Sequence, residues 1–221
     1  MRTRRKQLFG EELANSISHG IMAIFGIFVL VFLLVKSDTL SKTFGAIIFG
    51  LSVTALYTFS TLYHVWMNES FKNKILKRFD HISIYLLIGG TYAPILLNLT
   101  TITSIPSFIP NISVGLLFFI VQWLLIITGI VFKSIWLNKF HWIHVIIYLV
   151  LGWTAMFFID KIYNYNVIFF WLIISGGLAY TFGVIFYSLS EKVKYFHFVW
   201  HLFVMAGTIL HAIAIIKYIY V

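Results

Sequence analysis

Seven long apolar stretches, separated by short polar or charged segments, constrain the fold of this chain more than any other feature. They cover roughly residues 14–36, 43–66, 80–100, 112–132, 140–159, 165–188 and 197–219. A hydrocarbon core about 30 Å thick needs roughly 20 apolar residues per crossing helix. Because 61% of the 221 residues are hydrophobic and only 10% are charged, a soluble domain could not bury this surface. The sequence therefore predicts an all-α membrane protein, with a single seven-helix transmembrane domain over residues 1–221.

The distribution of lysine and arginine predicts how the bundle is oriented. Of the 16 such residues, four lie in the N-terminal arm, four in residues 72–78, and two each in the fourth and sixth connecting loops. The remaining four lie on the other side, so the positive-inside rule predicts a cytoplasmic N-terminus. With seven spans, the C-terminus is then extracytoplasmic. Contact of these loops with anionic lipid accounts for the net charge of +9, and no nucleic-acid partner is expected.

Polar residues gather at the ends of four spans that this orientation places in the cytoplasmic leaflet. Ionisable residues inside a membrane are costly and usually functional, so their convergence at one depth indicates a site. Within three of the spans they lie four residues apart, a spacing that places them on one helical face. They are Glu12, Asn15 and His19 in the first span, Ser60 and His64 in the second, Asp80 at the start of the third, and His197 and His201 in the seventh.

The histidines of this group are suited to zinc. His64, His197 and His201 could supply three nitrogen ligands, and a catalytic zinc site has three protein ligands and a water. Asp80 would hold that water and act as its general base. Ser60 lies one turn deeper than His64 and could donate a hydrogen bond to the water or to a substrate carbonyl.

Several of these residues also have a structural interpretation. Ser60 could bond back to a carbonyl of its own helix, and Asp80 could cap the start of the third span. A single histidine near the membrane interface is often a hydrogen-bonded residue rather than a ligand. We expect a structural role for the other four histidines, which are His81, His141, His144 and His211. His211 lies about 15 Å deeper than His201 and cannot share a metal with it.

The order of these polar residues along the chain resembles a known family. Glu12-x-x-Asn15-x-x-x-His19, Ser60-x-x-x-His64, Asp80, Gly90-Thr-Tyr-x-Pro94 and His197-x-x-x-His201 together look like the bacterial hemolysin III proteins. That family lies within the progestin and adiponectin receptor (PAQR) group, in a wider superfamily that includes alkaline ceramidases. The resemblance spans essentially the whole chain.

The resemblance implies a seven-helix bundle with a cytoplasmic N-terminus in the bacterial plasma membrane. It also implies a zinc ion held by His64, His197 and His201, with Asp80 and Ser60 acting on a water beside it. In the animal receptors and ceramidases such a site is linked to hydrolysis of lipid amides. We therefore expect a zinc-dependent hydrolase whose partners are membrane lipids. The Glu12, Asn15 and His19 stripe is typical of the bacterial branch, and its role is left open.

Three other functions compete with the hydrolase. A receptor-like or structural zinc protein would use the same ligands without catalysis. A cytolysin is what the family name suggests, but the first apolar stretch is too long for a cleavable signal and no soluble state is evident. A bis-histidine haem bundle could use His64 and His201, yet it would leave His197 and Asp80 without a role. We therefore expect no haem.

Overall fold

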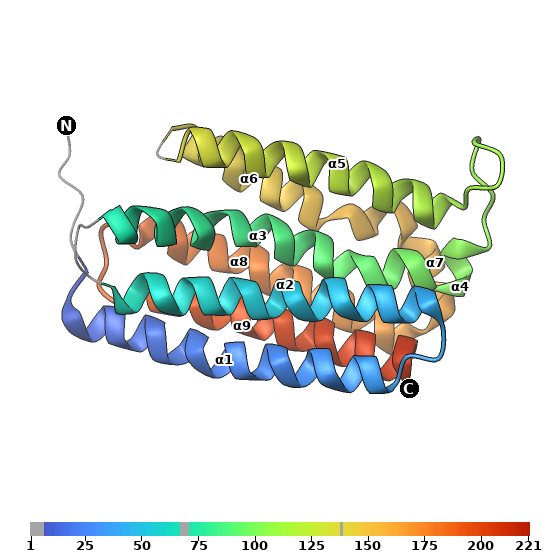
Figure 1. The fold of residues 1–221 in the computed structure, drawn as a ribbon, viewed down its shortest axis with the longest axis horizontal. Coiled ribbons are helices and arrows are strands. Elements are labelled where there is room, and N and C mark those ends of the chain that lie inside the picture. The colour runs from blue at the N-terminus through green and yellow to red at the C-terminus, as the bar shows by residue number, and fades with distance from the viewer. Residues whose placement is uncertain (1–6, 67–70, 138) are drawn as a thin grey trace.

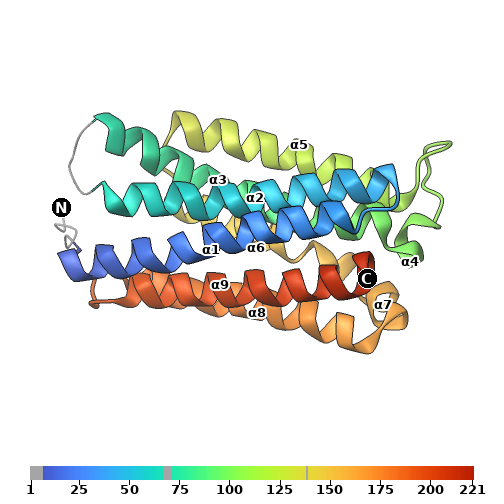
Figure 2. The same ribbon diagram turned by 60° about the horizontal axis from the view of Figure 1, so that its bottom comes forward.

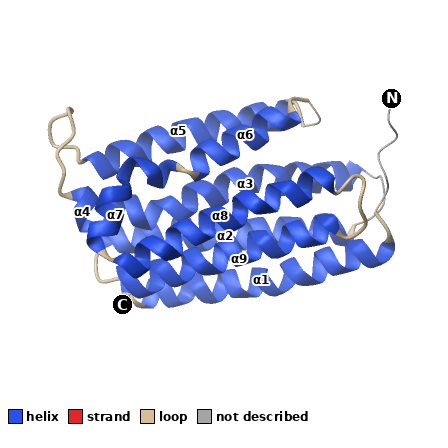
Figure 3. Cartoon of the chain, turned by 180° about the vertical axis from the view of Figure 1, so that it is seen from behind, coloured by secondary structure: helices blue, strands red, loops and turns tan. Residues whose placement is uncertain are grey.

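The computed structural model describes residues 7–66, 71–137 and 139–221, and these residues form a bundle of long helices without a β-strand (Figures 1 and 3). Seven segments of the described chain are long and apolar enough to cross a membrane, which confirms the predicted number of spans. The helices are α1 (Phe9–Val35), α2 (Leu40–Val65), α3 (Phe71–Asn98), α4 (Thr100–Thr103), α5 (Val114–Ile135), α6 (His141–Gly152), α7 (Ile159–Tyr165), α8 (Val167–Leu189) and α9 (Phe196–Ile215).

The third helix begins earlier than the sequence analysis expected. It starts at Phe71, so Asp80 lies in its third turn rather than at its start, and the interpretation of Asp80 as a helix cap was wrong. Hydropathy marks only the part of a helix that lies in lipid. Lysine, leucine and arginine are good helix formers, and the segment from Lys74 to Arg78 therefore continues α3 beyond its apolar part.

The fifth span is not one continuous α-helix. Helix α6 ends at Gly152, a 3₁₀ turn follows at Thr154–Phe158, and α7 completes the crossing. Backbone groups released by such a break need other partners in a membrane. The Tyr92 hydroxyl supplies two of them, because it donates to the Gly152 carbonyl (2.6 Å) and accepts from the Ala155 amide (3.0 Å). The side-chain amide of Gln122 donates to Thr154 Oγ1 at 3.2 Å.

Close helix packing is unevenly distributed over the bundle. Helix α2 packs closely along α1 and α3, α8 packs along α9, and α1 also contacts α9. At Gly50 the backbone of α2 approaches α1 so closely that an added Cβ would lie 2.5 Å from the Leu30 Cβ. In Figure 1 helices α5 and α6 lie on the side of the bundle opposite α1, and Figure 2 shows α8 running beside α9; α6 contacts its neighbours only sparsely.

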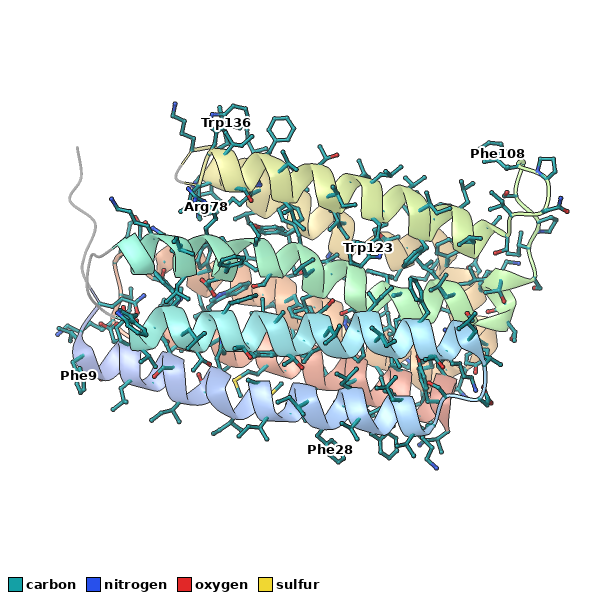
Figure 4. All side chains as sticks on the ribbon, viewed as in Figure 1. Phe9, Phe28, Arg78, Phe108, Trp123 and Trp136 are labelled. Carbon is teal, nitrogen blue, oxygen red and sulfur yellow. The ribbon has the colours of Figure 1, made fainter. Side chains whose placement is uncertain are left out.

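The ends of the helices that carry the predicted site lie together. Phe9, Arg78 and Trp136 lie at one end of the bundle, and Phe108 lies at the other (Figure 4). The starts of α1, α3 and α9 and the end of α2 therefore share one depth, as the sequence analysis expected. The assignment of that end to the cytoplasm stays a prediction from the charge distribution.

Candidate metal centre

Three histidines from two helices converge at this end of the bundle. His64 lies in the last turn of α2, and His197 and His201 lie in the first two turns of α9. Each offers one ring nitrogen, and the three nitrogens lie within 4.8 Å of one another. The structure thus brings together the three residues that the sequence analysis selected as ligands.

The hydrogen bonding of these rings leaves nitrogens free for an ion. His64 and His201 are buried, and Nε2 of His64 and Nδ1 of His201 have no partner among the described residues. A buried nitrogen without a partner is costly, because it has lost its contact with water. A bound cation would remove that cost, so this group could hold a metal ion.

Ser60 and Asp80 complete the site from α2 and α3. The buried Ser60 lies one turn before His64, and its hydroxyl is a hydrogen-bond partner of the Asp80 carboxyl group. Asp80 in turn interacts electrostatically with His64. Both residues line the same cavity as the three histidines. A carboxylate, a hydroxyl and three imidazoles thus face one space, as the sequence analysis predicted.

Glu12 from α1 makes the most direct contact to a candidate ligand. Its Oε2 lies 2.5 Å from Nδ1 of His64, on the ring side away from the unpaired Nε2. Metal-binding histidines usually give their second nitrogen to a carboxylate or carbonyl, which fixes the tautomer and the ring orientation. With Nδ1 protonated toward Glu12, Nε2 carries the lone pair that a metal needs.

His19 and Asn15, the other two polar residues predicted on α1, make different kinds of contact. The His19 ring stacks on the His201 ring with centroids 3.6 Å apart and an interplanar angle of 13°. Both His19 nitrogens are buried without a partner among the described residues, yet His19 is not part of the three-histidine group. Asn15 is buried and donates to Gln7 Oε1 at 2.8 Å. His19 therefore supports His201 by packing, and Asn15 fixes the chain before α1.

Glu11, which joins the starts of two helices, was not among the predicted site residues. Glu11 is only 1% exposed; its Oε1 accepts from the Tyr195 amide at 2.6 Å and its Oε2 from the Leu8 amide at 2.8 Å. Tyr195 has a positive φ of 62° and immediately precedes α9. This contact fixes the first turn of α9, which carries His197, relative to α1. An acidic residue in a first helical turn was the only sequence signal.

A cavity of about 210 Å³ extends from the three histidines into the bundle. Apolar side chains such as Leu56, Leu87 and Val204 line its depth, together with residues of α6 and α8. His211 also lines the cavity, and its Nε2 lies 3.0 Å from the Ile173 carbonyl oxygen, a contact within the bundle that fits the structural role expected for it. The remaining lining includes His81, Lys133, His141 and His144.

Comparison with known proteins places this site in a family context. Residues 8–212 match the family described as Haemolysin-III related. Hemolysin-3 of Bacillus cereus is 35% identical over 221 residues, which is 98% of this chain and 95% of that protein. The Hemolysin-3 homolog of Bacillus subtilis (strain 168) is 35% identical over 202 residues, covering 90% and 89%. The human monocyte to macrophage differentiation factor is 27% identical over 224 residues, covering 98% and 88%.

Proposed function

Because this chain belongs to the hemolysin III family of membrane proteins, we propose that it is a zinc-dependent hydrolase that cleaves amide or ester bonds of lipids in the cytoplasmic leaflet. The observation that carries the proposal is the convergence of three histidines and the Asp80–Ser60 pair on one cavity with apolar depth. A structural zinc site needs only ligands. A carboxylate and a hydroxyl beside three ligands, which leave one coordination position open, favour a catalytic site over a structural one.

The donor set favours zinc over other groups. Neutral imidazole nitrogens are good zinc ligands, and three of them leave a coordination position open. The ring centroids of His64 and His201 lie 5.0 Å apart with the rings at 70°, which favours one ion over a porphyrin plane between them. Bound zinc would polarise a carbonyl and make a water a stronger nucleophile.

The side chains of the protein would carry the proton transfers. The Asp80 carboxylate accepts a proton from the attacking water and then gives it to the nitrogen or oxygen that leaves when the C–N or C–O bond breaks. The products are a fatty acid and an amine or alcohol. The Ser60 hydroxyl orients the Asp80 carboxylate, and the apolar lining of the cavity holds the acyl chain.

The Asp80→Asn variant tests this proposal. We expect purified wild-type protein to carry about one zinc per chain, and the variant to keep that zinc, because asparagine still forms hydrogen bonds in the same space. Release of fatty acid from a panel of amide and ester lipids should fall by about 10²–10⁴-fold, since the amide cannot accept a proton. Metal analysis and mass spectrometry of the products are the two measurements.

The exposed Asp160 provides the matched control, because it lies in the first turn of α7 and does not line the cavity. Asp160→Asn should keep both zinc and activity. Loss of zinc from Asp80→Asn would identify Asp80 as a ligand of a closed, structural site. Wild-type protein with full zinc that releases no fatty acid from any lipid in the panel would reject the hydrolase in favour of a receptor-like or structural zinc protein.

A further inference from the structure

A buried lysine lies in the cavity wall on the side of α5 and α6. Lys133 occupies the last turn of α5, is only 1% exposed, and lines the cavity. A lysine at a helix end normally extends its ammonium group to the aqueous interface. The nearby Lys139 is exposed in that way. Lys133 instead points inward, so its charge needs a partner inside the bundle.

No acidic side chain in the described residues provides that partner. None of them forms an ion pair with Lys133, and the charged residue that acts on it is another cation, Lys77. The two acidic residues of the cavity are engaged elsewhere: Glu12 contacts His64, and Asp80 interacts with His64 and Lys77. A buried charge without a partner is strongly unfavourable. Lys133 is therefore a buried cation that lacks an anionic partner among the described residues.

His144 adds a hydrogen-bond donor beside this lysine. It is 4% exposed, interacts electrostatically with Lys133, and its Nδ1 lies 2.7 Å from the hydroxyl of the fully buried Tyr85. Among the described residues the Tyr85 hydroxyl has no other acceptor, so it donates to Nδ1. The proton of the neutral imidazole is then on Nε2. His144 can thus donate to an anion that Lys133 attracts.

We propose that Lys133 and His144 form a binding site for the phosphate group of an anionic lipid. This inference rests on the proposed function, because it assigns the substrate class of the same cavity. A phosphate offers several acceptor oxygens to donors from α5 and α6, and His81 and His141 also line this wall. The apolar lining accepts the acyl chain, and the cytoplasmic leaflet is the source of anionic lipids. The lipid would then bridge the phosphate site and the metal centre.

Binding of matched lipids to the purified full-length protein tests this site without a need for turnover. The probes are phosphatidic acid, the diacylglycerol with the same chains, the corresponding free fatty acid, and inorganic phosphate. We expect phosphatidic acid to bind at least about tenfold more tightly than diacylglycerol, the ratio that one charge-assisted hydrogen bond provides. Native mass spectrometry or displacement of a fluorescent phosphatidic acid gives the affinities.

Four variants identify the groups responsible. Lys133→Met, which keeps the length of the side chain without its charge, should lose about tenfold or more of the affinity for phosphatidic acid and leave diacylglycerol binding unchanged. Lys133→Arg should retain phosphatidic acid binding. Lys139→Met is the control, because it removes an exposed charge near the same end. His201→Ala should lose the metal and keep the binding.

Each opposite result overturns the proposal. Equal affinity for phosphatidic acid and diacylglycerol would show that no phosphate site exists. Equal affinity for the fatty acid and for phosphatidic acid would show that the site binds carboxylates as well as phosphates. Tight binding of inorganic phosphate, without tighter binding of phosphatidic acid, would show that the ligand is free phosphate and not a lipid. The two proposals can fail separately. Wild type that binds phosphatidic acid through Lys133 but hydrolyses nothing would reject the hydrolase, and hydrolysis unaffected by Lys133→Met would reject the phosphate site.

Discussion

At the scale of single residues, the spacing of the polar residues was sufficient to select three histidines as candidate ligands and Asp80 as a residue beside them. Residues four apart share a helical face, and this rule places His197 beside His201 without any knowledge of the fold. The rule says nothing about contacts between helices. The partners of Glu12 and Glu11 were therefore missed, because each contact joins α1 to a residue far away in the sequence.

The contact of Glu12 with His64 leads to a prediction about metal retention. Glu12→Gln removes the charge that holds the Nδ1 proton and leaves the size of the side chain unchanged. We expect the affinity for zinc to fall by about 10–100-fold, as is typical when the carboxylate behind a metal-binding histidine is changed. Titration of purified protein with a competing chelator measures the affinity. Asp38→Asn, in the exposed connection between α1 and α2, should have no effect.

At the scale of whole helices, apolar stretches predicted the number of crossings but not their ends or their interruptions. The boundary of α3 was placed at Asp80, because hydropathy ends where the charged residues begin, whereas the helix continues to Phe71. The break after Gly152 was also missed. No proline marks it, and the side chains that stabilise it come from α3 and α5. Only the packed bundle determines such a break.

The hydroxyl of Tyr92 is therefore expected to stabilise the bundle. Tyr92→Phe keeps the ring and removes the partner of the Gly152 carbonyl and the Ala155 amide. A buried group without a partner costs about 1–3 kcal/mol, so the free energy of unfolding should fall by roughly that amount. Thermal or denaturant unfolding in detergent provides the measurement. Tyr163→Phe is the control, because Tyr163 is half-exposed and its variant should keep the stability of the wild type. If Tyr92→Phe also kept that stability, water would have replaced the lost hydroxyl.

At the scale of the whole molecule, the sequence was sufficient to predict the class of fold and the shared depth of the polar residues. Alternation of charge between successive loops places the starts of α1, α3 and α9 and the end of α2 on one side, and the structure places these ends together. The buried position of Lys133 in the cavity wall was not foreseen. Lys133 was counted only as a loop charge, because its direction depends on how α5 packs against α3 and α6.

The orientation of the bundle follows from the charge distribution and can be measured directly. The chain contains no cysteine, so single cysteines introduced at chosen positions can report exposure to a membrane-impermeant maleimide. Phe108→Cys and Val221→Cys should react in intact cells, because both residues are exposed at the end predicted to be extracytoplasmic, where Figure 4 shows Phe108 and Figure 1 marks the C-terminus. Lys192→Cys should react only after the membrane is opened. Its loop, between α8 and α9, lies at the end that carries the candidate metal centre. The reverse pattern would move the candidate metal centre and the proposed phosphate site to the outer leaflet. In that case the substrate would have to be a lipid of that leaflet, and the positive-inside rule would fail for this chain.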